Sequence, residues 1–394
     1  MSKYQRIKGR SFLAWVVLAA LYGCAALERP ESAVSARVFP RVLQAGDVLD
    51  LHTGTKLSFE ELIRALETVR IVYVGEVHAR EADHEVQQRI VEGLWKAGKR
   101  IGIGVEMLPR TVQAALDLWV RGTVDEAEFL EAVGWERHWG FPFEAYRPVF
   151  MFAREKNIPM RALNAPPAVA RKVAHHGLEA LTEDERRQIA RHFFMDDAAH
   201  RAYIQEEFKA HVPGGIKDFE TFYQAQLVWD ETMAESLAVW LVQEPLDQVV
   251  VLAGKAHVNQ RFGIPERVRR RLEHRYAVVV PAADNEAPEQ VTAEVGDYLV
   301  VTAAEKPAPG HGKRLGVLLD KNPEGRGLRV RQVVPGSRAE KAGFLAGDLI
   351  VAADGDPVSD VSDLHRRFQS PQDAVVFTVD REGRVMEIRV DFGR

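Results

Sequence analysis

Residues 71–85 read IVYVGEVHAREADHE, and this stretch decides the fold that the sequence predicts. The apolar run at its start is short and rich in β-branched residues, which is typical of a strand buried on both faces. The run ends in Glu76 and His78, and His84 follows after a short loop. Burying a charged group is costly unless it is paired or ligated, so this strand end is the first candidate for a functional site.

Four more apolar runs of the same kind follow along the chain. They are RIGIGVEML (100–108), IPMRALNAP (158–166), QVVVLAGKAHV (248–258) and RYAVVVPA (275–282). Helical patterns separate them, and the stretch from about 167 to 245 predicts three helices over 181–194, 198–212 and 218–242, with Thr182 and Asp218 as N-caps. This alternation predicts an α/β fold with a mostly parallel sheet flanked by helices and interrupted by a helical insertion.

Polar side chains finish three of the predicted strands. Glu76 and His78 close the first, Glu106 closes the second, and His257 follows the run that contains VVVLAG. Because the carboxyl ends of parallel strands meet at the edge where open sheets bind ligands, we expect these four side chains to share one pocket. The alternative for each residue taken singly is a helix cap or a satisfied polar group in the core.

The Gly-x-Ser-x-Gly motif of serine hydrolases and the P-loop of nucleotide-binding proteins are absent from the sequence. His78 and His84 are six residues apart, which does not match the i, i+4 histidine pair of a zinc protease helix.

One face of the predicted helix over 218–242 carries polar residues among apolar ones: Gln226, Trp229, Asp230 and Met233. This face either lines the same pocket or binds loop backbone.

The N-terminus predicts export. A basic stretch precedes the apolar run SFLAWVVLAALYG and the single cysteine, Cys24, and small residues before a cysteine resemble the lipobox of bacterial lipoproteins. We expect a signal peptide over 1–23 that is cleaved before Cys24, lipidation of that residue, and a tether over 24–45. Ala25 and Ala26 in place of an aspartate favour the outer membrane. The alternative is an uncleaved membrane anchor. A net charge of −5 without a basic stripe argues against nucleic acid as a partner.

The last part of the chain resembles a bacterial PDZ domain. We interpret 46–282 as the α/β domain, 283–313 as a linker and 314–394 as the PDZ domain. The stretch VVPGSRAEKAGFLAGDLIVAADGDPV matches the short helix, turn and strand of such domains. The resemblance implies that a partner's C-terminal peptide adds a strand beside the carboxylate-binding loop. The implied peptide-binding residues are Leu315, Gly316, Val317 and Leu364.

The α/β region resembles the ChaN-type lipoproteins, which belong to a superfamily that includes the Tiki proteases and erythromycin esterases. The motifs that carry the resemblance are VYVGEVH, GVEM, IPMRALNAP, QAQLVWDETMAE and VVVLAGKAHV, in this order. The sequence departs from the family in having one residue between the Glu and the His of the first motif. The resemblance implies a haem-binding protein of iron uptake, in which two haems lie face to face between the protomers of a homodimer.

Two functions follow from this resemblance, and a third stays open. For haem binding, the aromatic stretch 134–153 and the AHRAY motif offer His138, Tyr146 and His200 as iron ligands. For a metal-dependent hydrolase, a peptidase or esterase, Glu76, His78 and His257 would hold a divalent ion and Glu106 would act as general base. A protein that acts only as a scaffold through its PDZ domain is the third alternative.

Overall fold

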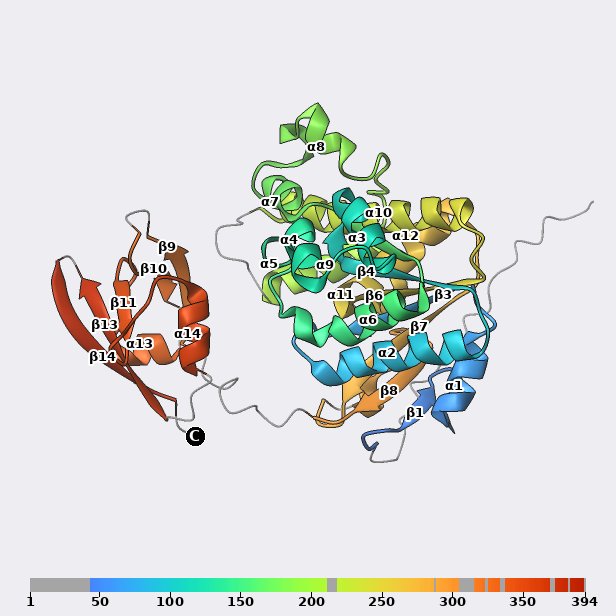
Figure 1. Cartoon of the computed structure of the whole chain (residues 1–394), viewed down its shortest axis with the longest axis horizontal. Coiled ribbons are helices and arrows are strands. Elements are labelled where there is room, and N and C mark those ends of the chain that lie inside the picture. The colour runs from blue at the N-terminus through green and yellow to red at the C-terminus, as the bar shows by residue number, and fades with distance from the viewer. Residues whose placement is uncertain are drawn as a thin grey trace, which may run out of the picture. The chain divides into compact units, whose positions relative to one another are not determined.

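A computed structural model describes residues 43–210, 218–286, 288–304, 315–322, 325–333, 337–368, 373–381 and 383–392. Its first sheet, which helices flank (Figure 1), has eight strands in the order β2-β1-β8-β7-β3-β6-β4-β5. The six strands from β8 to β5 are parallel, and β1 and β2 form an antiparallel hairpin at one edge. The strands are β1 (Val48–Asp50), β2 (Thr55–Leu57), β3 (Ile71–Glu76), β4 (Ile101–Pro109), β5 (Met160–Asn164), β6 (Gln248–Gly254), β7 (Tyr276–Ala283) and β8 (Tyr298–Thr302).

Helices cover both faces of this sheet, as the two main apolar clusters show. On one face the strands pack against α1 (Phe59–Leu66), α2 (Glu81–Lys96), α3 (Gln113–Val120), α4 (Glu126–Val133) and α6 (Arg147–Lys156). On the other face they pack against α10 (Phe219–Gln243) and α12 (Ile264–Arg271). The remaining helices are α5 (Trp135–His138), α7 (Pro167–His176), α8 (Glu183–Arg187), α9 (Ala198–Ala210) and α11 (Lys255–Val258). Short 3₁₀ turns are η1 (Arg110–Val112), η2 (Phe143–Ala145), η3 (Leu178–Ala180), η4 (Asn259–Arg261) and η5 (Pro288–Gln290). The predicted α/β fold is confirmed.

The predicted helix entrances at Thr182 and Asp218 are confirmed. The Thr182 hydroxyl accepts from the backbone N–H of Glu185 at the start of α8. The Asp218 carboxylate accepts from the backbone N–H groups of Glu220 and Thr221 at the start of α10. Each side chain satisfies donors that the first helical turn leaves without an intrahelical partner.

The predicted helix over 181–194 is wrong beyond Arg187. Residues 188–197, which we call the strap, run without helix across α10. Side chains of α10 accept from the strap backbone: Thr232 Oγ1 from Ala190 N at 3.0 Å and Glu231 Oε1 from Phe194 N at 2.8 Å. These side-chain acceptors replace the carbonyl acceptors of a helix, so tertiary contacts override the local helical pattern.

The predicted linker over 283–313 is also wrong in part. Its strand-like centre is β8, which pairs with β7 and with β1 inside the first sheet. Leu299, Val300 and Val301 are buried there. The polar, proline-containing segment before β8 is therefore a loop of the α/β domain, because the apolar strand needs the neighbouring β7 to bury both of its faces.

The C-terminal residues build a second sheet around a core of their own. Its strands are β9 (Val317–Lys321), β10 (Leu328–Val333), β11 (Leu349–Ala353), β12 (Asp356–Pro357), β13 (Ala374–Arg381) and β14 (Arg384–Asp391), and its helices are α13 (Arg338–Ala342) and α14 (Val361–Phe368). The predicted order of short helix, turn and strand ending in Asp354–Gly355 is confirmed. Among the described residues, no helix has the length and apolar character to span a membrane.

Candidate functional site

The Glu76 carboxylate lies at the end of β3 and receives three side-chain donors. Tyr146 Oη donates to its Oε1 at 2.8 Å, and His78 Nδ1 lies 2.8 Å from the same oxygen. His84 Nδ1 lies 3.1 Å from Oε2. Burial alone would raise the pKa of Glu76, but the hydrogen bonds from His78 and His84 outweigh it and lower the pKa to about 2. Glu76 is therefore a fixed anion that orients its neighbours.

His78 is the accessible member of this group. Its side chain is 30% exposed, whereas the Glu76 side chain is fully buried. The rings of Trp139 and Phe141 pack against the imidazole at centroid distances of 4.6 and 5.1 Å. Since Glu76 binds Nδ1, the other nitrogen, Nε2, has no hydrogen-bond partner among the described residues. Burial would lower the pKa of His78, but Glu76 and the nearby Glu106 carboxylate raise it.

Glu106 and His257 form a second carboxylate–imidazole pair at the same edge. His257 Nε2 lies 3.3 Å from Glu106 Oε1, and the Gly254 backbone N–H donates to Glu106 Oε2 at 2.6 Å. The other ring nitrogen of His257 lies 2.7 Å from Asp230 Oδ1. Burial would lower the pKa of His257, but the charges of Glu106 and Asp230 raise it well above its usual range. His257 is therefore an imidazolium held between two carboxylates.

Gly254, the last residue of β6, separates the two pairs. A Cβ at this position would lie 2.6 Å from His78 Cε1 and 3.5 Å from Glu106 Oε2. β6 runs between β3 and β4, so Glu76 and Glu106 reach the edge on either side of it. The absence of a side chain at residue 254 lets the two pairs approach each other. We call Glu76, His78, Glu106 and His257 the edge cluster.

The two carboxylates of the edge cluster arrive from opposite faces of the sheet. Val72 and Val74 share the face of Glu76 and pack in the apolar core on that face. His84 of α2 and Tyr146, the residue before α6, reach Glu76 from the same side. Gly102 shares the face of Glu106, and a Cβ there would meet Trp240 of α10. The alternation of side chains along each strand is thus seen in the contacts, and both helical layers meet at this edge.

The predicted metal ligands Glu76, His78 and His257 contact neighbouring side chains rather than a common point. Among the residues that the structure describes, no group of three histidine, cysteine or carboxylate side chains has the geometry to hold a metal ion. Both nitrogens of His257 face carboxylates, and Nδ1 of His78 faces Glu76. In this structure the carboxylates of Glu76 and Glu106 are therefore paired with imidazole donors.

The three predicted haem ligands lie in different surroundings. Tyr146 is buried and donates its hydroxyl hydrogen to Glu76, and burial together with that carboxylate raises its pKa. His200 is buried with both ring nitrogens in contact with other side chains. His138, at the end of α5, is only half-buried, and its Nδ1 lies 2.7 Å from the Val133 carbonyl oxygen. His138 alone among the three leaves a nitrogen, Nε2, without a partner among the described residues.

The predicted peptide-binding residues lie at the start of the second sheet and in α14. Leu315 and Leu364 are buried in its core, whereas Gly316 and Val317 are half-buried. Gly316 has φ +83°, and a Cβ there would lie 2.2 Å from Ser337 Cβ. The chain therefore requires glycine at this point of the loop. Cys24 and the predicted signal peptide over 1–23 lie outside the described residues.

Sequence reasoning missed several partners of the edge cluster. Tyr146 was expected as an iron ligand rather than as a donor to Glu76, and for His84 a partly buried first-turn histidine and a ligand were equally open. Asp230 was the exception, because its place on an otherwise apolar helix face indicated the pocket that it does contact. A buried carboxylate at a strand end requires donors, but the sequence does not show which distant residues supply them.

Comparisons with known proteins agree with this architecture. The family described as haem-binding uptake, Tiki superfamily, ChaN matches residues 62–268. The PDZ domain family matches residues 329–381. The solved structure described as "Cofacial heme binding to ChaN of Campylobacter jejuni" is 18% identical and has a TM-score of 0.52, covering 66% of this chain and 98% of that one. At this identity the likeness shows a shared fold.

A curated protein is also similar in sequence. It is "Protein RETICULATA-RELATED 5, chloroplastic" of Arabidopsis thaliana, 24% identical over 273 residues. The alignment covers 64% of this chain and 35% of that protein. This chain thus spans about a third of the length of that relative.

Proposed function

Because this chain belongs to the ChaN family of the Tiki superfamily, whose description is haem-binding uptake, we propose that it binds haem. The observation that supports this most is the family match over more than half of the chain, together with the fold that it shares with a haem-binding ChaN protein. The C-terminal PDZ domain is the second functional unit, and it binds the C-terminal peptide of a partner.

His138 is the residue that we propose as the iron ligand. A ligating histidine usually donates its second ring N–H to a carbonyl or carboxylate, which fixes the tautomer and the ring orientation. His138 has this arrangement, because Nδ1 lies 2.7 Å from the Val133 carbonyl oxygen and Nε2 is left as the acceptor. The neighbouring Trp139 and Phe141 are half-buried aromatic residues of the kind that a haem face requires. Tyr146 fits less well, since its hydroxyl is buried and bound to Glu76.

Titration of the full chain with haemin tests both statements. We expect a Soret band displaced from that of free haemin, lost in His138→Ala and kept in Tyr146→Phe. His176→Ala removes an exposed histidine of α7 and is the matched control, with no expected effect. A Soret band that survives His138→Ala but is lost in Tyr146→Phe would assign the iron to the tyrosine. Sedimentation with and without haemin then tests the proposed homodimer with a face-to-face haem pair.

We further propose that the chain is a lipid-anchored protein of the cell envelope, linked to iron uptake. The basic stretch, the apolar run and Cys24 support this placement. Mass spectrometry of the membrane-extracted protein should find an acylated Cys24 as its first residue, and Cys24→Ala should move the protein to the soluble fraction. An uncleaved N-terminus would contradict the lipoprotein proposal and favour a membrane anchor.

One observation favours a second candidate function, proton transfer in a hydrolytic reaction on a peptide or ester. His78 is partly exposed, its Nδ1 is fixed by the buried Glu76, and its Nε2 is left for a substrate or water. This arrangement follows the logic of an imidazole oriented by a carboxylate. It assigns proton transfer to His78 rather than to Glu106, because the pKa of Glu106, which burial would raise, is lowered by His257.

Turnover of a panel of peptide and ester substrates separates the two candidates. If the edge cluster is catalytic, His78→Gln should abolish turnover and leave the haem Soret band unchanged. Metal analysis of the same preparation tests whether an ion takes part. Loss of the Soret band together with unchanged turnover in His78→Gln would contradict the hydrolase.

A further inference from the structure

Asp230 of α10 lies between two histidines that come from different elements. Its Oδ1 is 2.7 Å from His257 Nδ1, and its Oδ2 is 3.5 Å from His200 Nε2. The Asp230 side chain is 2% exposed and that of His200 is 1% exposed. One buried carboxylate therefore joins the edge cluster to α9, on which His200 lies.

Arg267 determines which ring nitrogen of His200 carries the hydrogen. Its guanidinium lies 2.9 Å from His200 Nδ1, and because arginine can only donate, Nδ1 must be the acceptor. The ring hydrogen of His200 is then on Nε2, which faces Asp230. The second oxygen of Asp230 thus faces, at 3.5 Å, a ring N–H whose tautomer is set by the Arg267 guanidinium on the other side of the ring.

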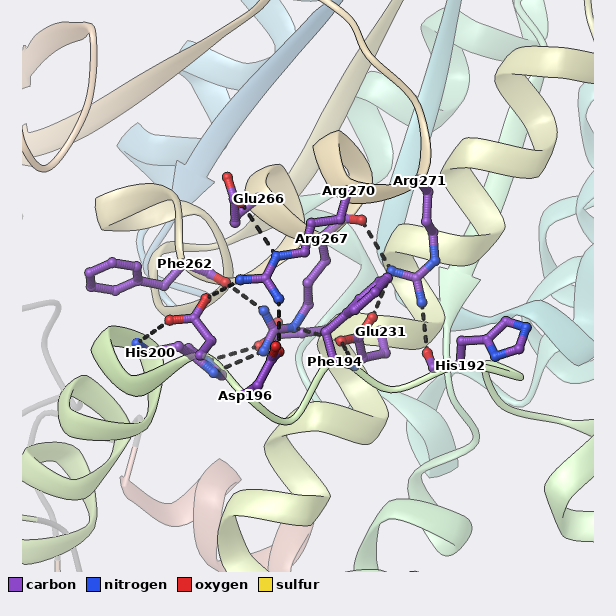
Figure 2. Close-up of polar contacts among 12 residues, drawn as sticks. His192, Phe194, Asp196, His200, Glu231, Phe262, Glu266, Arg267, Arg270 and Arg271 are labelled. Carbon is purple, nitrogen blue, oxygen red and sulfur yellow. Dashed lines mark hydrogen bonds and ion pairs between the residues drawn. The ribbon is translucent and has the colours of Figure 1, made fainter. Parts of the chain in front are cut away.

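Arg267 is itself fixed within the protein interior. Its side chain is fully buried, donates to the Phe262 carbonyl oxygen at 2.9 Å and lies 3.3 Å from Glu231 Oε1 (Figure 2). Figure 2 also shows Arg271 beside the same carboxylate. Three helices therefore supply the successive contacts that lead to His257: Arg267 lies in α12, His200 in α9 and Asp230 in α10.

We propose that Asp230 and His200 are positioning residues that set the ring orientation of His257 in the edge cluster. The inference rests on the proposed role of that cluster and adds two residues that act through His257 without reaching the site themselves. Asp230 lies closer to the His257 ring than Glu106 does, at 2.7 against 3.3 Å, so Asp230 dominates the orientation. With Nδ1 held in this way, Nε2 is aimed at Glu106. His200 keeps Asp230 from turning away.

Proton NMR of the full chain in water tests this directly, because a ring N–H bonded to a buried carboxylate gives a resonance at low field. We expect such resonances in the unaltered protein, and those lost in His257→Gln belong to the two ring N–H groups of His257, of which the one that faces Asp230 is followed. Asp230→Asn keeps an acceptor of the same shape but removes the charge, and should move the resonance upfield or abolish it. His200→Gln should move it in the same direction by a smaller amount.

The matched control is Tyr223→Phe. It removes a hydroxyl 3.3 Å from His200 Nδ1 and leaves the arginine donor in place, so the resonance should stay where it is. An unmoved resonance in Asp230→Asn, or equal shifts in Tyr223→Phe and His200→Gln, would overturn the proposal. The measurement needs neither haem nor turnover, so its outcome is separate from that of the proposed function. Far-ultraviolet circular dichroism of each variant identifies one that has failed to fold, in which case the remaining variant decides.

Discussion

At the scale of single residues, the site depends on buried carboxylates at strand ends, where side-chain and backbone donors replace the water that would otherwise solvate the charge. Glu76 is buried because it has three donors, and Glu106 is buried because a backbone N–H and an imidazolium face it. The identity of the four residues in the edge cluster could be predicted, since strand parity and the meeting of carboxyl ends bring them together. Their protonation could not, because it is set by Asp230, Tyr146 and His84 from elements whose packing the sequence does not specify.

Gly254 is the residue whose replacement should disturb this arrangement most directly. In Gly254→Ala the new methyl group would lie 2.6 Å from the His78 ring, so the imidazole must move. We expect a loss of about 1–3 kcal/mol in the free energy of unfolding, as for overpacked interiors. Denaturant unfolding checks this value. The control is Val77→Ala, because Val77 is exposed and precedes His78 in the sequence. It should change the free energy of unfolding by less than about 0.5 kcal/mol. Equal effects of the two substitutions would contradict the close contact.

The raised pKa of His257 has a consequence for stability as a function of pH. A group whose pKa is raised by folding contributes its full stabilisation below its ordinary value of 6.5 and loses it as the pH rises through the folded value. His257→Gln also leaves Glu106 and Asp230 without their cation, which should cost about 3–5 kcal/mol at pH 6. The difference in unfolding free energy from the unaltered protein should shrink as the pH is raised above 6.5.

Urea unfolding at a series of pH values measures this difference. The matched control is His176→Gln, at an exposed position of α7, for which a small and pH-independent difference is expected. A difference for His257→Gln that grows with pH would show that the ring is neutral in the folded protein.

At the scale of elements, α12 fixes the strap to the α/β domain. Arg271 lies 2.6 Å from Glu231 and donates to the His192 carbonyl oxygen at 2.8 Å. The Phe194 ring lies under the guanidinium groups of Arg270 and Arg271, at 5.3 and 5.1 Å. The sequence predicted a helix here, because the local pattern shows the apolar spacing but not the acceptors that α10 presents to the strap backbone.

We predict that Arg271→Met releases the strap. The substitution keeps an apolar stem but leaves the fully buried Glu231 with less compensation, at a cost of about 3 kcal/mol. Trypsin should then cut within residues 188–197 faster than in the unaltered chain. Arg269→Met is the matched control on the same helix, since Arg269 is half exposed and pairs with Glu266 one turn away. Its expected cost is below about 1 kcal/mol. Unchanged cleavage in Arg271→Met would show that the strap is held mainly by its backbone contacts.

At the scale of the whole molecule, the described residues contain two sheets with separate apolar cores. The cluster around Leu328 and Phe377 shares no member with the clusters of the first sheet. The fold class and both families were predictable, because periodicity and five ordered motifs extend over long segments. The end of the first sheet was not, because β8 is short and lies between polar segments that resemble a linker.

Separate cores predict two unfolding transitions in calorimetry of the full chain. Leu252→Ala, at a fully buried position of β6, should lower one midpoint, and Val379→Ala, fully buried in β13, should lower only the other. Each substitution should cost about 2–4 kcal/mol in its own transition. A single transition that moves in both variants would show that the two units unfold together.

Gly254 leaves a point between the two helical layers of the first sheet where no side chain stands. His78 lies at this point on the side of Glu76, and the Glu106 carboxylate, which His257 contacts, lies at it on the side of α10. A displacement of either helical layer relative to the sheet would therefore change the distance between the two carboxylate–imidazole pairs.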